Sequence, residues 1–594
     1  MLPEDIDPIT FEVIRNGLDT LVDEMALTVM RTAHSGVVKD AMDYSTAFCD
    51  RNGQVVAQGL TIVCHLGSFP AAVASVIDKY GDTMAEGDMF ILNDPYTSGG
   101  IHLPDIYVIQ PVFVDGEPEG FAGVVAHHTD VGGIVPGSNS TDSTEIYQEG
   151  LRIPTLRLYD RGEPVEAVFT LLAANVRVPD KVLGDLRAQI AAAHTGERGL
   201  VRLTDRYGAP AVRRYMDVLI DHSEHLAREE IQALPDGAYH ATGYIDADNV
   251  PDDGPLVLQV AVTIDGDRVI ADFEGSSSQM KAGINSPVPF TRAAVYGALR
   301  LLMDPGIPNS AGYTRLIEVR TPIASVVDPV LPAACGARGI TGFRIMDTVL
   351  AALAQAVPDR VPADGEGGNT IISIGGHDRS SPSPSTGEGW GEGELHTAAR
   401  PFAYVDLFAG ARGARPTGDG PDGVAHPAAN ISNTPVEIAE VESPVRIEEY
   451  ALLPDSGGAG KYRGALSQVR SVRCLADEAL LQLRSDKRAY PPFGLQGGAP
   501  GSPSYNILNP GDGQRVLTTM GTAPVRRGDL IRHELASGGG WGDPLERDPA
   551  MVLADYLDEK VTADHARQVY GVAIDPNTHQ VDTEATTRLR EELR

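Results

Sequence analysis

Three histidines and several aspartates lie close together between positions 93 and 133, and their side chains suit a divalent metal ion. Histidine is scarce in this chain, with 15 among 594 residues, yet His102, His127 and His128 all fall within this stretch. Imidazole and carboxylate groups together are common ligands of Zn²⁺, Mn²⁺ or Fe²⁺. A catalytic metal site here would make the chain a hydrolase or lyase rather than a scaffold. The nearby carboxylates belong to Asp94, Asp105, Asp115 and Asp130.

The sequence around these residues predicts a β-hairpin that brings the two halves of the motif together. Two apolar runs flank the dipeptide Asp115-Gly116, which is a strong hairpin-turn signal. His102 and Asp105 come just before the first run, and His127 lies at the end of the second. Because a hairpin places the start of one strand beside the end of the next, these three residues are expected to be neighbours in space.

His102, Asp105 and His127 are the first choice as metal ligands. The His-x-x-Asp spacing allows both side chains to face one point in a tight turn, and the preceding Gly-Gly pair favours that turn. A further carboxylate, from Asp43 or Asp40, could complete the set. Three protein ligands with one open position are typical of a catalytic metal, which acidifies bound water.

His128 and Asp130 are the candidate catalytic residues next to the predicted ligands in the sequence. Successive side chains of a strand face opposite ways, so His128 cannot point in the same direction as His127. Either residue could serve as a general base or as support for the ligands, and we favour support for Asp130. The alternative is purely structural, because histidines at strand ends and aspartates in turns often satisfy backbone groups.

Composition excludes several other classes of protein. The net charge of −34 would repel nucleic acid and anionic lipid, so neither is an expected partner. The four cysteines are far apart, which argues against a disulfide scaffold or a cysteine-based zinc site. The first residues do not resemble a signal peptide, and no run is long enough to span a membrane, so we expect a soluble cytoplasmic protein.

The chain is long enough for several domains, and its patterns predict a mixed α/β (α+β) multi-domain protein. A helix is expected over 11–34 from its apolar stripe. The Ser/Pro-rich and Gly/Glu-rich stretch 377–394 cannot pack a core and is interpreted as an inserted flexible loop. The predicted divisions are an N-terminal α+β domain with the metal site (1–180), a helical segment (181–240), a central α/β domain (241–376), the inserted loop (377–394) and a β-rich C-terminal domain with a terminal helix (395–594).

Two glycine-rich segments do not qualify as nucleotide sites. Residues 456–464 lack the first Gly and the Ser or Thr of a phosphate loop. Residues 410–423 contain two arginines that could bind an anion, but they have no strand-to-helix context. We interpret 410–423 as a loop.

Taken together, the motifs identify a resemblance to one family along nearly the whole chain. The segments DPITFEVIRNGL, DYSTAFCDRNG, NDPYTSGGIHLPD, HHTDVGG, EGLRIP, NVRVPDKVLGDLRAQIAA, NTPVEIAEVESPVRIEEY, LLPDSGGAGKYRG and GGGWGDP resemble, in order, the B-type component of the hydantoinase/oxoprolinase family. The resemblance implies that the metal ligands are His102, Asp105 and His127, with Asp43 as a fourth. The sequence departs from the family at Val38–Met42 before Asp43, at Cys335 and at the insertion.

The resemblance also implies a function. Members of the family work with an actin-like hydantoinase A-type ATPase in a hetero-oligomer that opens hydantoins, 5-oxoproline or related cyclic amides. ATP is expected on that partner and not on this chain. The partner would phosphorylate the substrate, and this chain would hydrolyse it with metal assistance. Two alternatives stay open: a component of an acetone- or acetophenone-type carboxylase, although those chains tend to be longer, or a non-catalytic partner of the ATPase.

Overall fold

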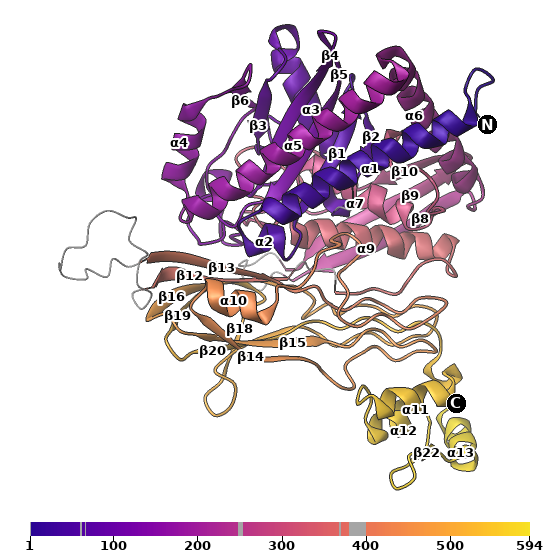
Figure 1. The fold of residues 1–594 in the computed structure, drawn as a ribbon. Coiled ribbons are helices and arrows are strands. Elements are labelled where there is room, and N and C mark those ends of the chain that lie inside the picture. The colour runs from indigo at the N-terminus through magenta and orange to yellow at the C-terminus, as the bar shows by residue number, and fades with distance from the viewer. Residues whose placement is uncertain (1, 60–61, 66, 247–253, 367–369, 379–399) are drawn as a thin grey trace, which may run out of the picture.

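The computed structural model describes residues 2–59, 62–65, 67–246, 254–366, 370–378 and 400–594. Figure 1 shows the N-terminal half as one body, a layered β structure below it, and a small helical unit at the C-terminus. Helices and several separate sheets alternate along the chain. The predicted mixed α/β multi-domain class is therefore confirmed.

The N-terminal body is built on a seven-stranded sheet with the order β2-β1-β5-β4-β3-β6-β7. The predicted hairpin is present, since β4 pairs with β5 around Asp115-Gly116, and β1 pairs with β2 around Asn52-Gly53 in a second hairpin. All pairs in this sheet are antiparallel. The strands are β1 (Tyr44–Asp50), β2 (Val55–Gln58), β3 (Met89–Leu92), β4 (Asp105–Val114), β5 (Glu117–His127), β6 (Leu156–Asp160) and β7 (Glu163–Pro164).

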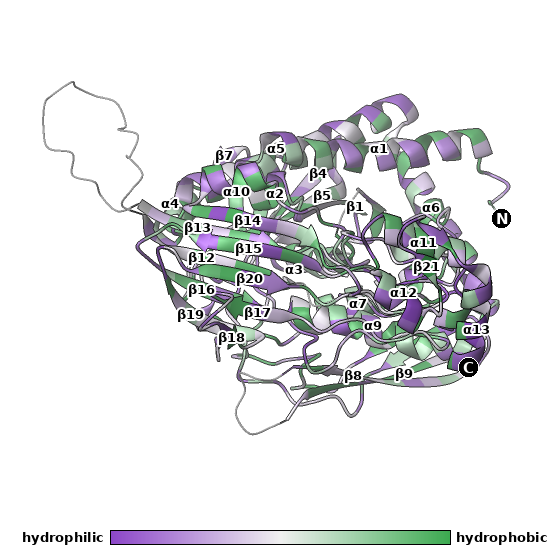
Figure 2. Ribbon diagram, turned by 90° about the horizontal axis from the view of Figure 1, so that it is seen from below, coloured by the Kyte–Doolittle hydropathy of each residue, from purple (hydrophilic) through white to green (hydrophobic). Residues whose placement is uncertain are grey.

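Long helices cover one face of this sheet. The predicted N-terminal helix is α1 (Pro8–Thr32). Asp7 is its N-cap residue, and the Asp7 side chain accepts a hydrogen bond from the Thr10 amide. It packs along α5 (Pro179–Tyr207), and α5 lies across β4 and β5. In Figure 2, hydrophobic and hydrophilic segments lie side by side on α1, as expected for a helix with one buried face. The buried face carries the apolar stripe, which includes Phe11, Ile14, Leu18, Leu21, Met25 and Val29.

The predicted ranges 1–180 and 181–240 share one hydrophobic core, because α1, α5 and α6 (Ala209–Gln232) pack with the sheet. The other face of the sheet is covered by α3 (Phe69–Tyr80), which has its own apolar cluster. Short elements complete this body: α2 (Gly36–Lys39), the 3-10 helix η1 (Val63–His65) and α4 (Glu166–Asn175).

The central region carries a four-stranded sheet with the order β11-β10-β9-β8. Its β10–β11 pair is parallel, and the others are antiparallel. Helix α9 packs on β8, β9 and α7, and its N-terminal end approaches the seven-stranded sheet. The elements are β8 (Gly237–Ile245), β9 (Leu256–Asp265), β10 (Arg268–Asp272), α7 (Val288–Arg300), α8 (Ala311–Thr314), β11 (Ile317–Arg320) and α9 (Gly339–Ala356).

The β-rich part of the chain is a sandwich of two sheets around one core. One sheet has the order β13-β12-β16-β19 and the other β14-β15-β20-β17-β18. Helix α10 (Val436–Glu442) contacts β14. The strands are β12 (Ile371–Asp378), β13 (Arg400–Leu407), β14 (Val445–Leu452), β15 (Gln468–Cys474), β16 (Glu478–Arg484), β17 (Tyr505–Leu508), β18 (Arg515–Leu517), β19 (Met520–Arg526) and β20 (Leu530–Glu534).

The predicted insertion begins at the end of β12, since residues 377 and 378 belong to that strand. The rest of it, 379–394, lies outside the described residues. Strand β12 pairs antiparallel with β13, and residue 378 is the register partner of residue 400. The insertion thus connects two directly adjacent strand ends.

The chain ends in a small unit of three helices and a two-stranded sheet, drawn in yellow in Figure 1. The predicted C-terminal helix is α11 (Pro549–Leu557), and α12 (Ala563–Val569) and α13 (Thr583–Leu593) were not expected from the sequence. The strands are β21 (Ile574–Asp575) and β22 (Gln580–Val581). None of the helices in the described part of the chain has the length and apolarity needed to cross a bilayer.

Candidate metal centre

Strand register brings the predicted ligands to one edge of the seven-stranded sheet. Asp105 is the first residue of β4 and pairs directly with His127, the last residue of β5. On the other side of β5, Tyr44 pairs with Ala126, so Asp43 comes next to His127. The His127 amide donates to the Asp43 carbonyl at 2.9 Å. The hairpin that the sequence predicted is therefore what assembles the site.

His102 reaches the same point through the tight turn that precedes β4. Gly99, with φ of +74°, makes the turn. The His102 Nε2 atom lies 3.0 Å from Asp105 Oδ2. Its Nδ1 atom donates to the Gly336 carbonyl at 2.9 Å, which leaves Nε2 without a proton. A backbone carbonyl that holds the far nitrogen of the ring in this way is typical of histidines that bind metals.

Several ligand atoms at this centre are buried without satisfying partners. Asp105 Oδ1 and His127 Nδ1 have no hydrogen-bond partner among the described residues. The side chains of His102 and Asp105 are fully buried, and His127 is nearly so. Unpaired polar atoms in a protein interior are costly and call for an explanation. A divalent cation would satisfy these atoms, so the residues fit a metal ion.

Two overlapping groups of side chains could each hold an ion, and both contain Asp105. One is the predicted set of His102, Asp105 and His127. The other joins Asp105 to Asp43 and His65. The ligand atoms within each group lie within 4.8 Å of one another. Among the candidate ligands, His65 is the one that the sequence reasoning missed.

His65 enters the site from η1, between β2 and α3. Its Nε2 atom lies 3.7 Å from Asp105 Oδ2, and its Nδ1 atom lies 2.7 Å from the Ser45 hydroxyl. Its sequence context, a histidine before a turn and helix, carries no ligand signature. The only local signal was a further histidine in a chain where histidine is rare.

The electrostatics of the centre suit neutral imidazoles beside carboxylates. Burial lowers the pKa of both His65 and His102 to about 4, so both rings are neutral and able to bind a metal at physiological pH. Burial also holds the pKa of His127 well below its usual value. Burial raises the pKa of Asp43 to about 7, and the charge of Asp105 adds to this shift. A cation would favour the ionised form of both carboxylates.

Two arginines bring positive charge to the same place from other parts of the fold. Arg338, at the start of α9, pairs with Asp105 Oδ2 and lies over the Phe290 ring. Arg484, the last residue of β16, donates to Asn139 Oδ1 at 2.9 Å. Burial and then the charge of Arg338 lower the pKa of Arg484 to about 9, so it stays charged at neutral pH. Neither arginine was predicted from the sequence.

His128 turns away from this group of ligands. The Gln189 amide nitrogen donates to the carbonyls of Ile106 and Val124, so its oxygen faces His128. His128 Nε2 therefore donates to Gln189 Oε1, at 2.9 Å. This hydrogen bond ties the end of β5 to α5.

Asp130 is placed in the loop that follows β5. Its two oxygens accept hydrogen bonds from the amides of Gly132, Gly137 and Arg177, and from the Arg177 guanidinium. The loop it holds leads to Asn139, whose side-chain nitrogen lies 3.5 Å from His127 Nε2. Asp130 thus contacts the centre only through this loop.

The cavity at the centre is small. It has a volume of about 20 Å³ and is lined by Asp43, His65, His127, Arg338 and Arg484, among others. One water molecule needs roughly 10–15 Å³ by this measure. The cavity has room for an ion or a water molecule, but not for an organic ring.

Comparison with known proteins places the whole chain in a family. A model described as hydantoinase B/oxoprolinase matches residues 7–544. The chain is 33% identical to the beta chain of the caprolactamase of Pseudomonas jessenii, over 98% of each chain. It is 32% identical to a protein of Pseudomonas sp. (strain NS671) named as the candidate B component of a D-/L-hydantoinase, again over 98% of each.

Two solved structures share the fold. The crystal structure of the ATP-dependent caprolactamase from Pseudomonas jessenii matches with a TM-score of 0.86 and 32% identity, over 99% of this chain and 100% of that one. A nucleotide-free acetone carboxylase structure matches with a TM-score of 0.89 at 20% identity, over 99% of this chain and 83% of that one, and shows likeness of fold alone. With a family model that covers most of its length, the chain belongs to the hydantoinase B/oxoprolinase family.

Proposed function

We propose that this chain is the metal-holding component of an ATP-dependent enzyme that hydrolyses a cyclic amide, a hydantoin or a lactam. The observation that carries the proposal is the convergence of buried ligand atoms on one point, where Asp105 Oδ1 and His127 Nδ1 lack partners among the described residues. Relatives named as components of a hydantoinase and a caprolactamase support the reaction class.

The residues that would hold the metal are His102, Asp105 and His127. Asp43, proposed as a fourth ligand, groups with Asp105 and His65 rather than with the two ligand histidines. When bound, a divalent ion such as Zn²⁺, Mn²⁺ or Fe²⁺ lowers the pKa of water toward neutrality and polarises a carbonyl or phosphoryl oxygen. The His65 Nε2 atom lies 3.7 Å from Asp105 Oδ2, which places this ring beside the ligand carboxylate. Gly336 fixes the His102 ring through its carbonyl.

Arg338 and Arg484 supply positive charge where negative charge develops during hydrolysis. Both guanidinium groups line the small cavity, and both are buried. Charges held in place in a buried site stabilise a transition state strongly, because they need no reorganisation. They would stabilise the oxygens of a tetrahedral carbon and a departing phosphate.

His128 and Asp130 have a supporting role in this proposal. His128 fixes the end of β5 against α5, and Asp130 fixes the loop that carries Asn139. Neither contacts the cavity directly, so neither is assigned the general base.

ATP chemistry is assigned to a separate A-type ATPase, which would phosphorylate the amide oxygen of the substrate. The relatives are named as single components of larger enzymes, one of the B type and one a beta chain, which supports a partner of this kind. Two-protein organisation also agrees with the absence of a phosphate loop in this sequence.

The test is co-expression with the A-type ATPase, followed by metal analysis and an assay with ATP against caprolactam, 5-oxoproline and hydantoins. Ring opening should depend on ATP, on this chain and on a bound transition metal, and His102→Ala should abolish it. A folded, metal-free protein with full activity, or an unimpaired His102→Ala variant, would contradict the proposal.

The same assay separates the two alternatives. ATP turnover that requires bicarbonate and a ketone would identify a carboxylase component. Ring opening that survives loss of the ligands, but not loss of the whole chain, would identify a non-catalytic partner.

A further inference from the structure

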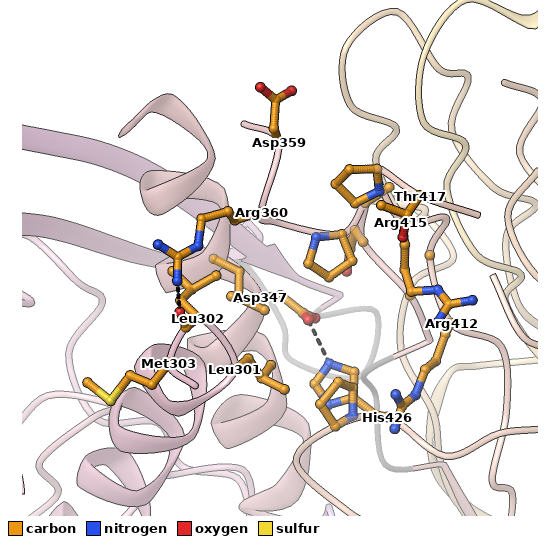
Figure 3. Close-up of a pocket in the computed structure, with 18 of the residues that line it drawn as sticks. Leu301, Leu302, Met303, Asp347, Asp359, Arg360, Arg412, Arg415, Thr417 and His426 are labelled. Carbon is orange, nitrogen blue, oxygen red and sulfur yellow. Dashed lines mark hydrogen bonds and ion pairs between the residues drawn. The ribbon is translucent and has the colours of Figure 1, made fainter. Parts of the chain in front are cut away.

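A second, much larger pocket lies between α9 and the β-rich part of the chain. Its volume is about 550 Å³, which is in the range of small-molecule sites. One wall is formed by Leu301–Asp304, after α7, and by Leu350 of α9. Opposite them lie the segment 412–417 and His426 (Figure 3).

Two arginines on one wall have no carboxylate partner. Arg412 donates through Nε to the Ala425 carbonyl at 2.6 Å, and Arg415 donates to the Asp419 carbonyl at 3.4 Å. Within the described part of the chain, neither guanidinium lies within ion-pair distance of an acid. Burial, together with the charge of Arg415, lowers the pKa of Arg412.

Five acids line the pocket: Glu230, Asp304, Asp347, Asp359 and Asp364. Asp347 and Asp364, beside His426 and Phe493, are already engaged. Asp347 accepts from His426 Nε2 at 2.8 Å and from Lys487 Nζ at 3.0 Å. Asp364 accepts from Lys487 Nζ at 2.6 Å. Lys487 is fully buried and lies between the two carboxylates. Arg360 pairs with Glu230, so Arg412 and Arg415 are the lining arginines without an acidic partner among the described residues.

The arginine wall is fixed by backbone hydrogen bonds. The Arg412 carbonyl accepts a hydrogen bond from the Ala465 amide. The Ala414 amide donates to the Gly539 carbonyl, and the Ala414 carbonyl accepts from the Ala363 amide. A preformed wall costs less to organise on binding than a mobile one. The rest of the lining contributes apolar side chains, namely Leu301, Leu302, Met303, Leu350, Pro362, Pro416, Pro427 and Phe493.

The pocket is separate from the metal centre but adjoins it. His426 lines the pocket, Phe343 lines the small cavity, and their rings stack with centroids 5.2 Å apart. His426 Nδ1 accepts from the Ala428 amide, and Nε2 faces Asp347. Both nitrogens of the ring are therefore occupied, and the ring acts as a wall.

We propose that this pocket binds an organic anion, a molecule that carries one carboxylate or phosphate group on an apolar body. The anionic group contacts Arg412 and Arg415, because guanidinium groups match the planar oxygens of carboxylate and phosphate. The body of the ligand lies against the apolar wall formed by Leu301, Leu302 and Leu350. The glycine-rich segment 410–423, interpreted from the sequence as a loop, is then the structural part of an anion site.

The test is calorimetric titration of the full chain with hexanoate, hexyl phosphate and the neutral hexanamide. We expect one of the two anions to bind at one site per chain, and hexanamide to bind at least tenfold more weakly. Arg412→Gln and Arg415→Gln should each weaken the anion at least tenfold. The preferred anion tells whether the ligand is a carboxylate or a phosphate ester.

Two controls keep the result specific. Arg360→Gln changes the same charge in the same pocket, but Arg360 is already engaged with Glu230 and the Leu302 carbonyl, so affinity should change less than threefold. Chelator-treated, metal-free protein should bind the anion unchanged.

Equal affinity in the Arg415→Gln variant, whose exposed position preserves the fold, would overturn the proposal. Loss of binding on chelation, equally tight hexanamide, or no binding of either anion would also overturn it.

Discussion

At the scale of single residues, Asp105 is the point on which the metal centre depends. It is the side chain shared by both candidate ligand groups, and it is also paired with Arg338. Burial opposes its charge, but His102 and Arg338 hold its pKa well below the usual value. A carboxylate kept ionised in a buried site is ready to accept a cation.

His65 and His128 offer a matched pair of substitutions. His65→Gln should weaken metal binding roughly tenfold to a hundredfold, because residues that hold a ligand in place typically contribute this much. His128→Gln should leave metal content unchanged, because that ring faces Gln189. Competition with a chelator, read by elemental analysis, measures both. Equal metal loss in the two variants would contradict the separation of roles.

His533 gives the sandwich a pH dependence of its own. Burial lowers its pKa from 6.5 to about 3, and its Nδ1 atom donates to Asn506 Oδ1 at 2.8 Å. Between pH 6.5 and about pH 3, His533 binds a proton in the unfolded chain but stays neutral in the folded chain. Above pH 6.5 the titration of His533 therefore does not lower the free energy of unfolding. As the pH falls below 6.5, it lowers that free energy by up to about 1.4 kcal/mol per pH unit.

Urea unfolding between pH 7.5 and 4.5 checks this expectation. His533→Gln keeps a donor for Asn506 but does not titrate, so its stability should fall less steeply on acidification than that of the parent protein. Parallel curves for the two proteins would show that His533 is not a source of the acid sensitivity.

At the scale of elements, the β4–β5 hairpin sets the distance between Asp105 and His127. Its turn residues, Asp115 and Gly116, have φ values of +53° and +83°. Asp and Gly tolerate this conformation, and it matches the twist of the strands. The turn therefore helps to fix the register that pairs the two ligands.

Gly116→Val should lower the free energy of unfolding by about 1–2 kcal/mol, the cost of the left-handed conformation for a residue with a side chain. A Cβ atom there meets no other atom within 4 Å, so the cost comes from the backbone alone. Gly116→Asn should cost less, since asparagine tolerates this region. Denaturant titration of both variants provides the comparison, and equal losses would point to a different cause.

The elements of the site that could be predicted from the sequence are those with local signals. Alternating apolar runs and an Asp-Gly turn predicted the hairpin, and the hairpin placed His102 and Asp105 beside His127. Arg338 and Arg484 could not be found in this way, because they reach the cavity from α9 and β16, more than 200 positions from Asp105. Their local sequence reflects a helix start and a strand end, and only tertiary packing brings them to the metal centre.

At the scale of the whole molecule, the stretch 379–399 should be dispensable. It connects the paired ends of β12 and β13, and two adjacent antiparallel strands need only a two-residue turn. Replacing 379–399 with Asn-Gly should leave metal content and thermal unfolding temperature nearly unchanged. A large loss of either would show that the stretch contributes to the folded core.

Limited proteolysis of the intact chain should cut first within 377–394.

The small cavity at the metal centre has a consequence for how the protein works over time. Its walls come from the seven-stranded sheet, α9 and β16, so three separate parts of the fold close around a space of about 20 Å³. A cyclic amide is far larger than that space. Under the proposed function, a substrate of that size would have to displace some of these walls to reach the ligands. Ring opening would then require the three parts to move relative to one another, whereas a water molecule already fits the space.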